Sequence, residues 1–198
     1  MNRNNPLILV HGLWNTPYLF DTICNILSNN NISVYCPSLP HKCGRISLPD
    51  LAVDLEIYIK STFDSSTNID VLGFSMGGLI LRYWLQKLGG SLQTNRFFSI
   101  GTPHFGTFTA DLVPFSWLEG IADMKTNSSF LRYLNEDVSL LKNVQCYSYG
   151  CSSDLMVIPY SNSFLPFGAA RKIPVLTHRS LITSRKSISI LLEDILVK

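Results

Sequence analysis

The sequence predicts an α/β fold, with one domain over residues 1–198 that contains about six mostly parallel strands and helices on both faces of the sheet. Short apolar runs alternate with segments of helical periodicity along the chain. Strands separated by helices form right-handed parallel crossovers, which bring the strands into one sheet. No linker-like change in composition divides the 198 residues, and that length suits one domain better than two.

The expected strands are apolar or β-branched runs, several of them bounded by turn-forming residues, as strands buried on both faces should be. They are 6–10, 32–36, 69–74, 96–100, 144–149 and 173–177. The longer segment from Thr102 to Asn143 has helical pieces but no clear strand.

Four segments carry the expected helices. Thr16 is an expected N-cap, with Pro17 at the first helical position. The run 47–50 resembles a capping box before a stripe of leucines, and a further helix is expected over 75–88. The last helix should start near Ser184.

Composition excludes several classes of protein. Apolar residues make up 46% of the chain, enough for a core, which excludes disorder. The net charge is +2 and no Lys/Arg-rich run is present, so no nucleic-acid partner is expected. Charged residues account for only 15%, where about 25% is usual. This low charge needs an explanation.

Neither a targeting signal nor a metal site is expected. The N-terminal stretch lacks the apolar region and cleavage site of a signal peptide, and no run is long enough to span a bilayer. The five cysteines are irregularly spaced, and the cluster Cys36, His41 and Cys43 lacks the second ligand pair of a zinc site. We therefore expect a reduced, cytoplasmic protein without a cofactor, and a monomer by default.

Chemically active side chains follow three of the predicted strands. In an open parallel sheet, ligands bind outside the carboxyl ends of the strands. Ser75 follows the third strand within Gly-Phe-Ser-Met-Gly, Asp154 follows the fifth, and His178 follows the sixth. A serine, an acid and a histidine in this chain order indicate a triad for nucleophilic catalysis.

Each member of the triad also has a plainer interpretation. The Gly-x-Ser-x-Gly pattern alone is weak evidence, because it also occurs by chance in sequences of this composition. Here it is more specific, because it joins a β-branched strand to a helix. Asp154 alone among its rivals follows a strand and precedes the histidine, although an aspartate there can also cap a turn. His178 alone follows Asp154, although a histidine there can also be an ordinary surface residue with its hydrogen bonds satisfied. The rivals are Asp111, Asp123, Asp137 and Asp194 for the acid, and His11, His41 and His104 for the base.

An oxyanion hole needs two backbone N–H groups aimed at the developing negative charge. Met76, directly after the serine, should supply one. Leu13, in the loop after the first strand, should supply the other. Both assignments rest on position alone, since the donors belong to the backbone.

Taken together, the motifs make the chain recognisable. It resembles the α/β-hydrolase superfamily and, within it, small bacterial triacylglycerol lipases of the minimal, lidless type. The resemblance implies Ser75 as nucleophile, Asp154 as acid and His178 as base, with no cofactor. Phe74 stands where these lipases often have histidine. The matching stretches are LILVHGLW (7–14), DVLGFSMGGLILRYW (70–84), FFSIGTPHFGT (97–107), CSSDLMVIP (151–159) and LTH (176–178).

Two loops rich in large apolar residues, 105–118 and 155–167, follow strand ends on the face that carries Ser75. They complete a small core, or they form an acyl-chain trough and a rim for peripheral contact with a membrane or lipid surface. His104 belongs to a stretch typical of the lipases, where it is not a triad member, and we interpret it as a second layer of the site or a substrate wall. The expected substrate-binding residues are His104, Phe105, Met156 and Val157.

Three functions remain open on the sequence. The first is a lipase or carboxylesterase acting on lipid esters. The second keeps the triad but transfers the acyl group or cleaves a thioester, because the motifs do not identify the acceptor. The third is a non-catalytic lipid-binding protein on a hydrolase fold. An intact triad argues against the third.

Overall fold

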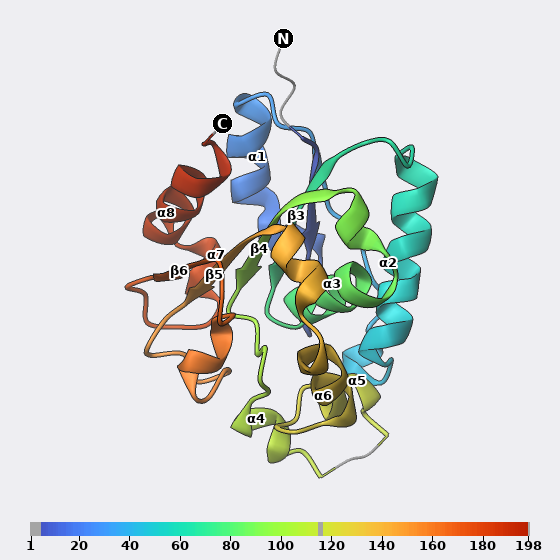
Figure 1. The fold of residues 1–198 in the computed structure, drawn as a ribbon. Helices are drawn as coiled ribbons and strands as arrows, with labels where there is room; N and C mark the ends of the chain where they lie inside the picture. The colour runs from blue at the N-terminus through green and yellow to red at the C-terminus, as the bar shows by residue number, and fades with distance from the viewer. Residues whose placement is uncertain (1–4, 115–116, 198) are drawn as a thin grey trace.

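In a computed structural model, which describes residues 5–114 and 117–197, six strands form one sheet in the order β2-β1-β3-β4-β5-β6 (Figure 1). Every neighbouring pair of strands is parallel. The α/β class and the six-stranded parallel sheet predicted from the sequence are therefore confirmed. The strands are β1 (Leu7–Val10), β2 (Val34–Tyr35), β3 (Ile69–Phe74), β4 (Thr94–Ile100), β5 (Gln145–Gly150) and β6 (Ala169–Lys172).

Helices cover both faces of the sheet, because successive residues of a strand point to opposite sides. Ile8 and Val10 of β1 pack into one core with α2 and α3, whereas Leu7 and Leu9 pack into the other with α1 and α8. The helices are α1 (Asp21–Asn29), α2 (Leu48–Thr62), α3 (Met76–Lys87), α4 (Phe108–Asp111), α5 (Glu119–Asp123), α6 (Ser129–Glu136), α7 (Ser180–Thr183) and α8 (Arg185–Ile195).

Two of the predicted helix starts are confirmed by their caps. The Ser47 hydroxyl accepts a hydrogen bond from the Asp50 amide at the start of α2, and Ser184 is the N-cap of α8. Thr16 and Pro17 also take the predicted N-cap and first helical positions, but those of a short 3₁₀ turn and not of α1 itself. The Thr16 side chain makes no capping bond, and residues Pro17–Phe20 wind as this 3₁₀ turn before α1 begins at Asp21.

The sixth strand lies earlier in the chain than the predicted run 173–177, and its residues Ala169–Lys172 are mostly exposed. It is an edge strand that pairs only with β5 among the described strands, so its sequence carries no apolar signal. Ile173 adds one more bond, from its N–H to the Gly150 carbonyl, and Pro174 follows without an N–H to donate. The apolar run therefore forms a loop, and His178 lies on that loop rather than directly after the strand.

The segment from Thr102 to Asn143 contains α4, α5 and α6, which gather at the lower end of Figure 1. Its described residues contain no strand, as predicted. Arg82 of α3 fastens this segment, because its buried guanidinium donates to the Leu134 carbonyl and to Asn135 Oδ1. Burial lowers the pKa of Arg82 to about 10. Within the described residues, no helix is long and apolar enough to cross a membrane.

Candidate active site

Ser75 occupies the sharp turn between β3 and α3, with φ 56° and ψ −125°. Such a backbone conformation costs about 1–3 kcal/mol in a non-glycine residue and persists only where the surroundings impose it. The Ser75 N–H donates to the Ile100 carbonyl at 2.8 Å. A Cβ at Gly77 would lie 2.1 Å from the Val10 carbonyl oxygen. Only glycine fits there.

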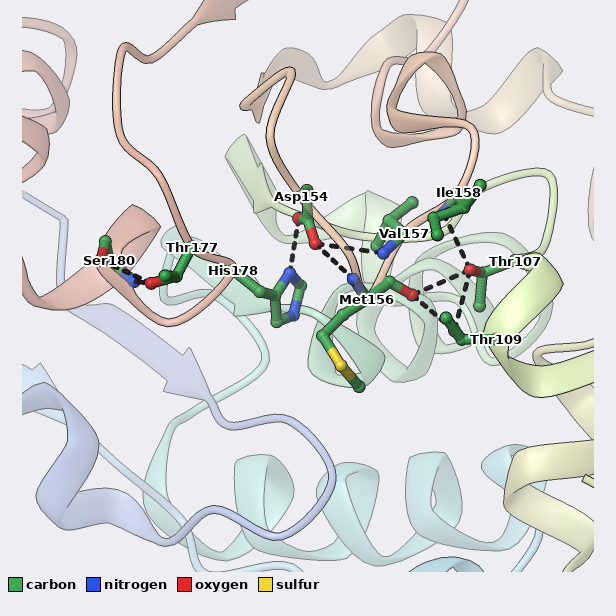
Figure 2. A network of polar contacts seen from close by, with 9 residues as sticks. All are labelled: Thr107, Thr109, Asp154, Met156, Val157, Ile158, Thr177, His178 and Ser180. Atoms are coloured by element: carbon green, nitrogen blue, oxygen red, sulfur yellow. Dashed lines mark hydrogen bonds and ion pairs between the residues drawn. The ribbon is translucent and has the colours of Figure 1, made fainter. Parts of the chain in front are cut away.

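Asp154 and His178 are held together by a short hydrogen bond (Figure 2). His178 Nδ1 lies 2.6 Å from Asp154 Oδ2. Asp154 Oδ1 accepts from the amides of Met156, at 2.8 Å, and Val157, at 3.1 Å. The carboxylate of Asp154 can only accept, and its side chain is 0% exposed, so it holds the imidazole with the proton on Nδ1 and leaves Nε2 as the acceptor.

His178 is packed beside the serine turn. Its ring centroid lies 4.8 Å from that of Phe74, the neighbour of Ser75, and a Cβ at Gly101 would lie 2.8 Å from its Cε1. His178 Nε2 is buried and has no hydrogen-bond partner among the described residues. Ser75 and His178 line the same cavity. The fold thus brings together the three residues that the sequence singled out.

The two expected oxyanion donors also lie at this turn. The loop of Gly12 and Leu13 runs past Ser75 so closely that a Cβ at Gly12 would lie 2.9 Å from the serine Cβ. The Leu13 amide has no hydrogen-bond partner among the described residues. Met76 is the first residue of α3, and N–H groups in the first turn of a helix have no partner within it. Both amides are therefore free to bind an anionic oxygen.

His11 supports that loop rather than acting as a base. Its Nε2 accepts a hydrogen bond from the Leu39 amide at 3.3 Å, so Nδ1 carries the proton and faces the Gly12 carbonyl at 3.0 Å. Burial lowers the pKa of His11, which keeps it neutral. The sequence argument considered His11 only as a rival to His178 and missed this positioning role.

Next to Ser75 lies a mainly apolar cavity of about 110 Å³, which we call the acyl cavity. Its walls come from the loop after β1, from α4 and α5, and from the loop that follows Asp154. The lining residues are Leu13, Trp14, Asn15, Ser75, Pro103, Thr107, Thr109, Ala110, Val113, Ile121, Met124, Met156, Val157 and His178.

Of the expected substrate-binding residues, Met156 and Val157 line the acyl cavity. Phe105 is 38% exposed but does not line it. His104 is 0% exposed and lines neither cavity at the site, which excludes the substrate wall and leaves the other interpretation, a second layer of the site. Its Nε2 lies 3.0 Å from Ser99 Oγ, and burial lowers its pKa well below the usual value. His104 therefore contacts β4 from inside the protein.

Thr107 is a residue of the site that sequence reasoning missed. Its hydroxyl donates to the Met156 carbonyl at 2.8 Å and accepts from the Ile158 amide at 2.9 Å (Figure 2). Its own amide donates to the Met124 carbonyl. Thr107 therefore joins the loop that carries Asp154 to the wall of the acyl cavity. Thr107 ends the stretch GTPHFGT, which was singled out in the sequence, but only His104 and Phe105 of that stretch were assigned to the site.

Asp123 holds α5, and with it one wall of the cavity. Its Oδ2 accepts from the Leu48 amide at the start of α2, at 2.8 Å. Burial raises the pKa of Asp123 to about 6. No group of three or more His, Cys, Asp or Glu side chains among the described residues is placed to hold a metal ion.

Solved structures share this fold at low identity. Bacillus licheniformis lipase BlEst2 in its mature form is 15% identical, with 98% of this chain and 93% of that chain covered and a TM-score of 0.77. Aspergillus fumigatus lipase B is 17% identical, with 99% and 53% covered and a TM-score of 0.78. The ydeN gene product of B. subtilis is 15% identical, with 98% and 100% covered and a TM-score of 0.71.

Sequence comparison identifies the family. A search of curated proteins found no match. The sequence model of palmitoyl protein thioesterase matches residues 6–148, which is more than half of the chain and includes Ser75, but ends before Asp154 and His178. The chain therefore belongs to the palmitoyl protein thioesterase family, within the α/β-hydrolases of the lipase, esterase and thioesterase type.

Proposed function

We propose that this protein hydrolyses carboxylic esters of lipids through an acyl-enzyme on Ser75. The observation that carries the proposal is the hydrogen bond of 2.6 Å between Asp154 and His178, on a histidine that lines the same cavity as Ser75. A nucleophile, a base and a group that orients the base are the parts that acyl transfer requires.

In the first half of the reaction, His178 Nε2 takes the Ser75 proton as Ser75 Oγ attacks the ester carbonyl carbon. The oxyanion that forms is held by the N–H groups of Leu13 and Met76. Asp154 stabilises the imidazolium without taking the proton. Collapse of the intermediate breaks the bond to the leaving alcohol, which receives its proton from His178.

In the second half, water takes the place of the alcohol. His178 removes a proton from water as the oxygen attacks the acyl-enzyme carbonyl, and the proton returns to Ser75 when the acid leaves. One ester and one water therefore give one alcohol and one acid. The residues described above perform every step.

An apolar surface beside the site supports a lipid substrate. Leu176 is 80% exposed, Leu155 76% and Trp14 61%, and all three lie at the site. Exposed apolar side chains gathered around a cavity favour contact with an apolar ligand or a lipid surface. This explains part of the low charge content. Of the two apolar loops, Leu155 belongs to this surface, Val157 is buried in the wall of the acyl cavity, and Leu165 is buried in the core.

A thioesterase is the second candidate, because the chain belongs to the palmitoyl protein thioesterase family. The same triad cleaves a thioester, with a thiol as the leaving group. An acyltransferase would also use this triad, and a lipid-binding protein without catalysis would use only the apolar surface. No contact within the site favours either of these two functions.

Hydrolysis of para-nitrophenyl esters of increasing acyl length, with an acyl thioester of matched chain, tests the proposal. The wild-type protein should hydrolyse medium or long acyl esters, and Ser75→Ala should lose nearly all turnover, by about 10⁶ in kcat as for a serine-protease nucleophile. Activity confined to acetyl esters would contradict a lipid substrate. Turnover retained in Ser75→Ala would contradict the mechanism. A preference for the thioester would favour the second candidate.

A further inference from the structure

A second, larger cavity of about 460 Å³ adjoins the acyl cavity. The two cavities share Met156, His178 and the residues 13–15 of the loop after β1. Only the acyl cavity includes Ser75. We call the larger one the leaving-group cavity. Its lining residues are Leu13, Trp14, Asn15, Phe74, Ser153, Leu155, Met156, Leu176, Thr177, His178 and Arg179.

The division of residues between the cavities indicates which part of a substrate each receives. The acyl part is joined to Ser75 in the intermediate and therefore lies in the cavity that Ser75 lines. The alcohol or thiol receives its proton from His178 and then departs. A cavity that includes His178 but not Ser75 is thus placed for the leaving group.

The leaving-group cavity contains a positive charge and no negative one among its described lining residues. Arg179 is the only described lining residue with a permanent charge, and its side chain is not paired with a carboxylate among the described residues. The acid of the site, Asp154, is buried and bound to His178. Asn15, Ser153 and Thr177 add neutral polar groups. The cavity therefore presents a cation without a counter-ion.

A guanidinium offers several N–H donors in a plane that matches two oxygens of a phosphate or carboxylate. We propose that the leaving-group cavity binds an alcohol or thiol that carries an anionic group, phosphate or carboxylate, and that Arg179 contacts this group. The proposal rests on the proposed function, because it assigns the cavity from the direction of acyl transfer.

Kinetics with matched esters test the proposal. Three esters of the same fatty acid are compared, which differ only in the phenol that leaves. One phenol is neutral, one bears a carboxylate and one bears a phosphate. The ratio of kcat/KM for an anionic ester to that for the neutral ester is compared between the wild-type protein and Arg179→Gln. The matched control is Lys142→Gln, which removes an exposed cation from residues that line neither cavity.

We expect Arg179→Gln to lower this ratio about fivefold to tenfold, mainly through KM, as for the loss of an exposed charge-assisted contact. The loss should shrink at high salt, because salt screens exposed charges. Lys142→Gln should leave the ratio within about twofold. The carboxylate and phosphate esters distinguish the two sources of anionic charge. An equal ratio in wild type and Arg179→Gln for both anionic esters would overturn the proposal.

A binding measurement without turnover distinguishes a failure of this proposal from a failure of the proposed function. Calorimetric titration of Ser75→Ala with the free phosphorylated phenol measures the cavity without any turnover. We expect saturable binding that weakens about fivefold to tenfold when Arg179→Gln is added. Binding of the neutral and phosphorylated phenols with equal affinity contradicts an anionic leaving group. A failure of all three esters to react, with this binding intact, contradicts the proposed function instead.

Discussion

Replacing Thr107 with valine tests how the loop that carries Asp154 is held. The substitution keeps the shape of the side chain and removes its hydroxyl. The Met156 carbonyl keeps a second donor, the Thr109 hydroxyl at 2.7 Å. The Ile158 amide, however, loses the acceptor it has at 2.9 Å. One partly buried donor is therefore left unsatisfied.

An unsatisfied buried donor costs about 1–3 kcal/mol, and the partly buried position of this amide favours the lower half of that range. For a chain of this size, 1 kcal/mol corresponds to about 2–4 °C in Tm. We therefore expect Thr107→Val to lower Tm by about 2–8 °C. The loop also supplies the Met156 and Val157 amides to Asp154, so its displacement should lower kcat about tenfold, since misplacement of about 1 Å can cost 10²-fold.

Thr109→Val is the matched control, because it leaves the Met156 carbonyl bonded to Thr107 and should change Tm and kcat little. Thr107→Ser, which restores a hydroxyl, should recover most of kcat. The assay measures Tm by calorimetry, and kcat and KM with one ester. The reasoning is refuted if Thr107→Val and Thr109→Val behave alike, or if Thr107→Val changes KM alone.

Three further predictions follow from other contacts. Asp154→Asn should lower kcat by about 10⁴, as in a serine protease, while circular dichroism shows an intact fold; near-normal turnover would exclude Asp154 as the acid. Burial raises the pKa of Asp123 from 3.8 to about 6 in the folded protein. The unfolded chain therefore loses this proton at a lower pH than the folded protein does, so the stability that Asp123 contributes is full below pH 3.8 and is lost as the pH rises through about 6. Asp123→Asn should flatten this fall in Tm between the two values, and an unchanged Tm profile would contradict the assignment. Cys24 and Cys36 have their sulfurs 3.5 Å apart, and oxidised glutathione should join them in a disulfide that raises Tm by several degrees, given about 3 kcal/mol for a loop of about 15 residues. Cys43→Ser should leave that change intact, and continued alkylation of both thiols by iodoacetamide after oxidation would refute it.

Local signals in the sequence were enough to predict five of the strands. Four of them, β1, β3, β4 and β5, lie in the interior of the sheet, where burial selects mostly apolar side chains. The fifth, β2, is an edge strand, but its residues Val34 and Tyr35 are β-branched and aromatic, which favours a strand. The edge strand β6 escaped prediction because most of its residues are exposed and carry no apolar pattern. Only its pairing with β5 identifies it as a strand, and pairing cannot be recognised from a single segment.

Candidate site residues could be predicted where one short motif carries the chemistry. Ser75 lies in such a motif, and Asp154 and His178 followed from their order along the chain. Long-range contacts were not predictable. Thr107 acts through a loop about 50 residues away and His104 is enclosed by the interior, so neither role is visible in the neighbouring sequence.

Labelling with a fluorophosphonate tests the central claim, that Ser75 is an activated nucleophile, most directly. The reagent reacts with a serine whose hydroxyl a base has activated. Mass spectrometry of the folded protein after digestion should find the adduct on the peptide that contains Ser75. Ser75→Ala should remove the adduct, and His178→Ala should slow its formation. A folded protein without an adduct at Ser75, or with its adduct on another residue, would contradict the claim.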